Sequence, residues 1–350
     1  MAKTRIAVLF GGMTKDHKVS LMSAYSLLKE IPREKYDVTP IGITRSGRWL
    51  YFPGDYEEIK NGTWEMNGDC CSAIISPDPL HSGIITIMSD GSTAMKRIEA
   101  VISVLHGKYG ECGRIQGLLK LSKIPYTDCE PETAAYCMDK AMTHLILSSA
   151  GIEVPKYVLL ERSDMNIIDE RIAEAERVLS YPMYISASSC SSSIGANIVH
   201  NAEEMKAAVK IAFSHHHTVI AEEELGGRTI ECGVYGNSYD VQTTVLGETV
   251  KTYGINSAAE YTAEYITCPE LTHAEEFAIK AAAIKAFRVM SFKGSAKMSF
   301  RLCEGRALLK RISPIPGMSE DSAFPMMMNA SGHDYGKMID RMISFALETD

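Results

Sequence analysis

The chain has 350 residues, of which 45% are hydrophobic and 23% charged, and its formal net charge is −8. This composition is typical of a soluble globular protein with two or three lobes, and the acidic balance argues against a general nucleic-acid binder. We find neither an apolar run of about 18 residues nor a secretory signal, so we expect no membrane span and a cytoplasmic location.

The nine cysteines are scattered along the chain, without a CxxC or Cys/His metal-binding spacing. An odd number of unpatterned thiols is typical of free cysteines in a reducing cytosol. The histidine run from His215 to His217 offers ligands for a metal, but we interpret it as a polar turn before a strand.

The first third of the chain alternates apolar strands with helices. The expected strands are 5–13, 35–44 and 99–113, and the expected helices are 19–31 and 114–124. This alternation predicts an α/β lobe with a parallel sheet over residues 1–137. Ligands bind at the carboxyl ends of such strands, where the glycine-rich ends of the first and third strands would meet. Residues 52–95 are polar and rich in turns, and we assign them no elements.

The pattern changes near residue 138. Shorter strands and helices predict two α+β lobes, over 138–225 and 226–350. The expected strands are 154–161, 181–188, 218–225, 228–236, 239–247 and 294–313, and the expected helices are 138–151, 201–214, 273–290 and 334–348.

Several segments occur in the order and approximate spacing of the D-alanine–D-alanine ligases. They are IAVLFGGMTKDHKVSLMSA (6–24), VLHGKYGECGRIQGLLKLSKIPYT (104–127), AAYCMDKAMTHLILSSAGIEVPKY (134–157), SSSIG (191–195) and PIPGMSEDS (314–322). The segment PIGITRSGRW (40–49) is most similar to the vancomycin-resistance D-alanine–D-serine ligases. The resemblance covers nearly the whole chain. It implies an ATP-grasp fold, in which a preATP-grasp α/β lobe precedes a central and a C-terminal ATP-grasp lobe.

The resemblance also implies a chemistry. ATP phosphorylates the carboxylate of one D-alanine, and the amine of a second D-amino acid attacks the acyl phosphate. Lysines and a glycine-rich loop hold the phosphates, oxygen ligands hold two Mg²⁺ ions, and an arginine with a backbone N–H stabilises the oxyanion. Phosphoryl transfer depends mainly on positioning and charge stabilisation, so these groups are the catalyst.

The metal-binding positions of that family are substituted in this chain. The resemblance aligns an E-x-N metal strand with Arg311 and Ser313, and an R-x-D pattern with Lys297 and Ser299. A guanidinium cannot lose its proton and accepts no hydrogen bond. We therefore expect no metal site, because its ligands are lost at Ser299, Arg311 and Ser313, and we treat Lys297 as a degenerate catalytic position.

The phosphate-binding positions are also substituted. Ser186 stands where the resemblance expects a lysine at a strand end, and Glu264 stands at the lysine of a flap segment. Ser191 replaces a loop glycine, which adds a side chain where backbone must approach a phosphate. Thr229 occupies the position of a ribose-binding glutamate.

The amino-acid side of the site is better retained. The resemblance implies substrate-binding roles for Asp16, His106, Ser192, Ser193 and Ser322, nucleotide-binding roles for Lys140, Glu222 and Glu223, and an oxyanion-binding N–H at Gly317. Asp16 is one methylene shorter than the glutamate expected there.

We interpret the chain as a ligase homologue without an intact catalytic centre and without ATP or Mg²⁺ as cofactor. It would bind a D-amino acid, a dipeptide or a phosphate-like ligand in peptidoglycan precursor metabolism. We expect a homodimer, or pairing with an active ligase, and neither a nucleic-acid nor a membrane partner.

Two alternative functions stay open at this point. The chain is an active ligase if a carboxylate such as Glu304 or Glu320 points into the site, or it is an amide ligase with altered chemistry. Two interpretations of Lys297 and Arg311 also stay open. Lys297 and Arg311 either pair with Glu222, Glu231 or Glu304, or they form an anion site.

Overall fold

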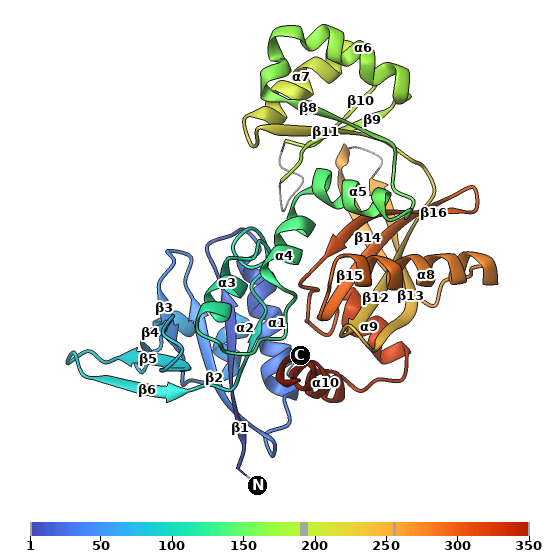
Figure 1. Ribbon diagram of the computed structural model, residues 1–350. Coiled ribbons are helices and arrows are strands. Elements are labelled where there is room, and N and C mark those ends of the chain that lie inside the picture. The colour runs from blue at the N-terminus through green and yellow to red at the C-terminus, as the bar shows by residue number, and fades with distance from the viewer. Residues whose placement is uncertain (1, 190–194, 255–256, 349–350) are drawn as a thin grey trace.

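The computed structural model describes residues 2–189, 195–254 and 257–348, with the backbone alone for 251–254 and 257–263. The described strands form a seven-stranded, a four-stranded and a five-stranded sheet. Figure 1 shows each sheet in a lobe of its own. This is the expected α/β architecture with additional α+β lobes, while the exact lobe boundaries at 137/138 and 225/226 stay predictions.

The N-terminal sheet has the order β6-β5-β4-β3-β2-β1-β7. β1 (Thr4–Gly11) pairs in parallel with β2 (Tyr36–Ile43) and β7 (Ala100–Ser103), as predicted. Its last six residues are buried, as is usual for a parallel strand covered on both faces. The remaining elements are α1 (His17–Glu30), β3 (Trp49–Tyr51), α2 (Tyr56–Asn61), η1 (Trp64–Met66), β4 (Cys71–Ile75), β5 (Gly83–Ile87), β6 (Thr93–Arg97) and α3 (Arg114–Leu121).

The strands β2, β1 and β7 are parallel as expected, but the sheet as a whole is mixed. β3 to β6 extend the sheet in antiparallel fashion, and they come mostly from the segment 52–95, to which we assigned no elements. β4, β5 and β6 follow one another without an intervening helix, so no alternation of strand and helix reveals them in the sequence.

The central sheet is antiparallel and has the order β10-β9-β11-β8. Two helices lie on the same side of it (Figure 1). The elements are β8 (Tyr157–Glu161), η2 (Arg162–Ile167), α6 (Ile168–Val178), β9 (Met183–Ala187), β10 (Asn197–Val199), α7 (Ala202–Phe213) and β11 (Thr218–Glu223). The sequence analysis missed α6, although its buried Ile168, Ile172 and Ala175 have helical spacing.

The C-terminal sheet has the order β14-β13-β12-β15-β16 and is antiparallel throughout. Its strands are β12 (Arg228–Gly236), β13 (Val241–Gly254), β14 (Ser257–Thr267), β15 (Gly294–Cys303) and β16 (Arg306–Ser313), and its helices are α8 (His273–Val289) and α9 (Ala323–Ala330). Along β15, Met298, Phe300 and Leu302 are buried, while the alternate residues are partly exposed. One face of the sheet therefore packs on the core and the other is left for a ligand.

The connecting helices join the C-terminal lobe to its neighbours. α4 (Pro131–Met138) and α5 (Lys140–Ser149) contribute Ala134 and Leu147 to the same hydrophobic core as Phe287 of α8. Figure 1 shows α4 and α5 between the three lobes. The start of α5 is therefore fixed beside the space between the central and C-terminal sheets.

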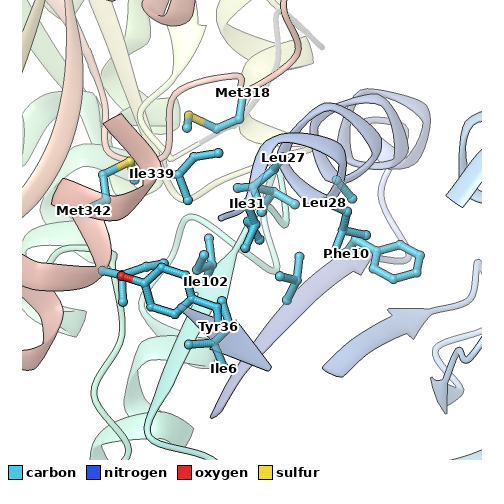
Figure 2. Close-up of a cluster of buried hydrophobic side chains, with 14 of the residues drawn as sticks. Ile6, Phe10, Leu27, Leu28, Ile31, Tyr36, Ile102, Met318, Ile339 and Met342 are labelled. Carbon is cyan, nitrogen blue, oxygen red and sulfur yellow. The ribbon is translucent and has the colours of Figure 1, made fainter. Parts of the chain in front are cut away.

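The last helix, α10 (Tyr335–Leu347), packs on the N-terminal lobe. Figure 2 shows Ile339 and Met342 of α10 near Leu27 and Ile31 of the N-terminal lobe. The Tyr36 hydroxyl also donates to Asp340 Oδ1 at 2.7 Å. This contact holds two lobes together. No helix among the described residues is long and apolar enough to cross a membrane.

Candidate functional site

A cavity of about 710 Å³ lies between the central and C-terminal sheets. Residues from α4, α5, β9, β10, β12, β13, β15 and β16 line it. Its lining cations are Lys140, Arg228, Arg301, Lys310 and Arg311, and its lining carboxylates are Glu111, Glu224, Glu231 and Glu248. Met138, Ile198 and Val250 add an apolar wall. The volume lies within the usual range for a small-molecule site.

The positions expected to have lost their metal ligands lie together on β15 and β16. Ser299 pairs across the strands with Arg311, and Lys297 pairs with Ser313. Glu231 of β12 pairs across the strands with Ser299, and it brings a carboxylate to the row formed by Ser299, Arg311 and Ser313. Lys297 Nζ lies 2.6 Å from Glu231 Oε1, and the Ser299 hydroxyl donates to the same oxygen at 3.2 Å.

These residues do not fit a magnesium ion. Mg²⁺ requires an octahedral shell of oxygen atoms, usually with one or two free carboxylates. Among the described residues, Glu231 is the carboxylate that strand pairing brings into this row, and Lys297 neutralises it. Among the described residues, no group of three or more His, Cys, Asp or Glu side chains could hold a metal ion. Glu304 and Glu320, considered above as substitute ligands, are not among the residues that line the cavity.

Arg311 behaves differently from Lys297. Its side chain is exposed, lines the cavity and makes no ion pair with any described residue. The expected pairing with Glu222, Glu231 or Glu304 is therefore found for Lys297 and not for Arg311. A register shift between Ser299 and Phe300 lets Lys310 line the cavity beside Arg311, although they are consecutive in sequence.

Lys140 begins α5 and contacts the central sheet. Its Nζ lies 3.2 Å from Glu222 Oε2 and donates to the Ser186 hydroxyl at 3.0 Å. Ser186, which stands at a lysine position of the resemblance, thus accepts a hydrogen bond from the remaining lysine. Lys140 is positioned at the cavity, but its charge already stabilises a fully buried carboxylate.

Glu222 belongs to a buried polar group rather than to the cavity wall. Burial alone would raise the pKa of its carboxyl, but the charges of Lys140, His144 and Lys310 outweigh burial and hold this pKa below its ordinary value. His144 Nε2 lies 3.6 Å from Glu222 Oε1, and burial lowers the pKa of this histidine. Neither Glu222 nor Glu223 lines the cavity, although both were predicted to bind a nucleotide.

A group of residues that the sequence did not predict lies between the two sheets. Lys140 Nζ and Lys310 Nζ lie 4.7 and 5.1 Å from the centre of the Tyr184 ring. Lys310 Nζ also lies 3.3 Å from Glu224 Oε2, and Arg301 lies 3.8 Å from Glu224 Oε1. Only the pairing of sheets distant in sequence brings these residues together, so no local motif reveals them.

Thr229 and Glu264 occupy structured positions of the C-terminal sheet. The Thr229 hydroxyl accepts a hydrogen bond of 2.9 Å from Arg301. Glu264 is exposed on the edge strand β14, opposite Val250. Its neighbour Tyr265 faces the sheet, where burial raises the pKa of the phenol. The predicted loop residues Ser191, Ser192 and Ser193 lie outside the residues that the structure describes.

Asp16 lies at the other end of the site, before α1. Its side chain makes no hydrogen bond or ion pair with any described residue. A Cβ on Gly107 would lie 2.6 Å from Asp16 Oδ2, so the absence of a side chain there permits their close approach. A half-buried carboxylate without a partner is suited to an ammonium group.

Ser23 connects this end of the site to the C-terminal lobe. Its hydroxyl lies 3.2 Å from His106 Nε2 and accepts a hydrogen bond of 3.1 Å from the Met318 backbone N–H. His106 Nδ1 in turn lies 3.7 Å from Glu111 Oε1, and Glu111 lines the cavity. The sequence analysis assigned His106 to the substrate side but missed Ser23 and Glu111.

The loop after β16 carries the remaining predicted residues. The hydroxyls of Ser319 and Ser322 lie 2.6 Å apart, which orients Ser322 toward Gly317. A Cβ on Gly317 would lie 2.7 Å from the Ser322 hydroxyl, so glycine leaves room for it. The structure thus brings Gly317 and Ser322 together and links their loop to His106 through Ser23.

Comparisons with known proteins agree with this geometry. The family model described as D-ala D-ala ligase N-terminus matches residues 5–129, and the one described as D-ala D-ala ligase C-terminus matches residues 146–344. A D-alanine–D-alanine ligase from Thermoanaerobacter sp. (strain X514) is 34% identical, with 100% of this chain and 98% of that protein covered. The vancomycin B-type resistance protein VanB from Enterococcus faecalis is 31% identical, with 99% of this chain and 100% of that protein covered.

Solved structures give the same result. The VanG D-Ala:D-Ser ligase from Enterococcus faecalis has a TM-score of 0.91 at 30% identity, covering 99% of this chain and 100% of that one. The D-alanine–D-alanine ligase from Coxiella burnetii has a TM-score of 0.87 at 26% identity, covering 99% and 94%.

Proposed function

This chain belongs to the D-alanine–D-alanine ligase family, and we propose that it binds family ligands without catalysing magnesium-dependent ligation. The observation that carries the proposal is the row formed by Ser299, Arg311 and Ser313. Glu231, the carboxylate that the described residues place beside this row, is already paired with Lys297. Without a free carboxylate, this row lacks the ligands for the Mg²⁺ ions that would neutralise the charge developing during phosphoryl transfer.

The amino-acid end supports retained ligand binding. Asp16 presents a carboxylate without a partner, while His106, Gly317 and Ser322 belong to a region linked by hydrogen bonds through Ser23. We propose a D-amino acid or a dipeptide as the ligand, in peptidoglycan precursor metabolism in the cytosol. The described cysteines are all free, in keeping with a reducing compartment.

Two measurements test the two halves of this proposal. With ATP, Mg²⁺ and D-alanine, we expect no phosphate release above that of a control without D-alanine. In calorimetry, D-alanine, D-serine or the D-alanyl-D-alanine dipeptide should bind, and Asp16→Asn should weaken binding at least about tenfold through loss of a charge-assisted contact. If none of these ligands binds, ligand retention is refuted.

The alternative of an active ligase is favoured by a specific observation. Glu231 Oε2 is buried and has no hydrogen-bond partner among the described residues, so this oxygen is available if Lys297 moves away. Under this alternative, phosphate release depends on D-alanine, and Glu231→Gln abolishes it. Release that survives in the variant would show that Glu231 is not the substitute ligand.

We also propose that the chain pairs with a second copy or with an active ligase through its N-terminal lobe. A hollow of about 480 Å³ on this lobe is lined partly by Trp49, Ile74, Ile75 and Leu118. Ile74 is 48% exposed, so a partner would cover apolar surface there. Sedimentation should detect a dimer that Ile74→Asp weakens. If the chain sediments as a monomer both by itself and after mixing with an active ligase, the proposed pairing is contradicted.

A further inference from the structure

The charged groups that line the large cavity are almost all paired, either with one another or with charged groups beside the cavity. Arg228 Nη2 lies 2.6 Å from Glu248 Oε2, and Lys310 shares Glu224 with Arg301. The other pairs are Lys140 with Glu222, Lys297 with Glu231, and His106 with Glu111, which is ionic only when the histidine is protonated.

Arg311 is the exception among the cavity-lining cations that the structure describes. It has neither an ion pair nor a hydrogen bond to a described side chain, and its guanidinium is exposed to the cavity. An entering cation would meet only carboxylates that already have partners. An entering anion would meet a guanidinium whose donors are free and whose charge is permanent.

We propose that Arg311 forms a metal-independent anion site and that the ligand is a small molecule carrying phosphate. A guanidinium binds phosphate oxygens in a bidentate manner, so it can supply positive charge at the strand where the family resemblance expects a metal. Lys310, which the register shift brings to the same cavity, adds a second positive group that its partner Glu224 partly neutralises. The inference rests on the proposed loss of the magnesium site.

The shape of the cavity favours an organic phosphate over a free inorganic ion. A cavity of about 710 Å³ is much larger than a phosphate group, and Met138, Ile198 and Val250 form an apolar wall within it. A ring or chain attached to the phosphate can bury apolar surface there while the phosphate contacts Arg311.

The experiment is calorimetry of the full chain with pyrophosphate and with ADP, each in EDTA and in millimolar Mg²⁺. We expect binding in EDTA, no gain in affinity from Mg²⁺, and tighter binding of ADP than of pyrophosphate. Equal affinities for pyrophosphate and ADP would show that the site recognises the phosphate groups alone, and would overturn the proposal that the ligand is an organic phosphate. An absence of binding in EDTA, or a requirement for Mg²⁺, would overturn the site itself.

Variants assign the binding to Arg311. Arg311→Gln should weaken the binding of both probes at least about tenfold. Arg311→Lys keeps the charge but loses the bidentate contact, so its affinity should lie between those of the wild type and Arg311→Gln. Arg97→Gln on the exposed strand β6 makes the same charge change far from the cavity and should leave affinity unchanged. Equal affinity of Arg311→Gln and wild type, with both folded, would refute the assignment.

The same design separates this inference from the proposed function. Failure of the proposed function appears as phosphate release that depends on D-alanine and Mg²⁺. Failure of the anion site appears as absent or metal-dependent binding of pyrophosphate and ADP. If Arg311→Gln does not fold, the wild-type titrations in EDTA and Mg²⁺ together with Arg311→Lys still decide the question.

Discussion

Replacing Lys297 by methionine should destabilise the C-terminal lobe. Lys297 Nζ lies 2.6 Å from Glu231 Oε1, and the two side chains are only 21% and 8% exposed. Lys297→Met leaves a buried carboxylate with one hydrogen bond, from Ser299, and a second oxygen without a partner. Breaking a buried pair costs about 3 to 5 kcal/mol, and solvent screening at the partly exposed lysine reduces our expectation to about 2 to 3 kcal/mol.

A double-mutant cycle isolates this pair. Because Glu231→Gln removes the charge that Lys297 neutralises, the double variant should recover most of the loss, with a coupling energy of about 2 kcal/mol. That energy corresponds to a roughly thirtyfold change in the unfolding equilibrium. Lys96→Met, which breaks an exposed pair with Asp37, is the matched control and should change stability by less than about 1 kcal/mol.

The assay must report on the lobe that contains the pair. Both tryptophans, Trp49 and Trp64, lie in the N-terminal lobe, so their fluorescence does not monitor this region directly. Amide hydrogen exchange of peptides from β12 and β15 measures local opening, and urea unfolding followed by circular dichroism measures the whole chain. Unchanged hydrogen exchange in Lys297→Met would show that Glu231 is not desolvated. It would also refute the claim that Lys297 stabilises Glu231 beside the strand where the resemblance expects a metal.

Three further predictions concern other buried groups. Burial raises the pKa of Asp128 from 3.8 to about 7, so the folded state retains a proton that the unfolded state releases. The unfolding free energy should therefore fall by about 4 kcal/mol between pH 4 and 7, and Asp128→Asn should flatten this slope in urea titrations at several pH values. Gly110→Ala would place a Cβ 1.7 Å from the Leu105 carbonyl oxygen and should cost about 3 kcal/mol in urea unfolding, whereas the control Gly68→Ala has nothing within 4 Å and should not. Lys140→Met removes a cation from a buried carboxylate and should cost about 3 kcal/mol near pH 7, with partial recovery at lower pH. A flat pH profile of the wild type, or variants as stable as the wild type, would contradict these assignments.

The fold was largely predictable because strong local patterns coincide with the elements. β1 is an apolar strand whose last six residues are buried and which ends at Gly11, and α8 begins with a capping box from Thr272 and Glu275. The antiparallel extension from β3 to β6 was missed because its strands are short and partly exposed, with weak alternation.

The candidate site was predictable only where residues share a strand. Arg311 and Ser313 lie on β16, and Lys297 and Ser299 lie on the neighbouring β15, although the sequence pattern alone predicted one strand over 294–313. The ion pair with Glu231 depends on the register between β12 and β15, which only the assembled sheet fixes.

Other members of the site arise from longer-range contacts. Lys310 enters through a register shift that ordinary strand alternation does not predict. Ser23 acts across lobes, through a hydrogen bond to Met318 that spans 295 residues of sequence. Neither contact leaves a local motif, so sequence reasoning could name the substituted positions but not the groups that now surround them.

Direct detection of the dipeptide product tests the central claim most directly. The full chain would be incubated with ATP, Mg²⁺ and D-alanine, alone and with D-serine, and the products identified by mass spectrometry beside an active family member. We predict no dipeptide above that of a heat-inactivated control. Dipeptide that accumulates in proportion to protein concentration, and disappears in EDTA, would contradict the account and establish a working magnesium site.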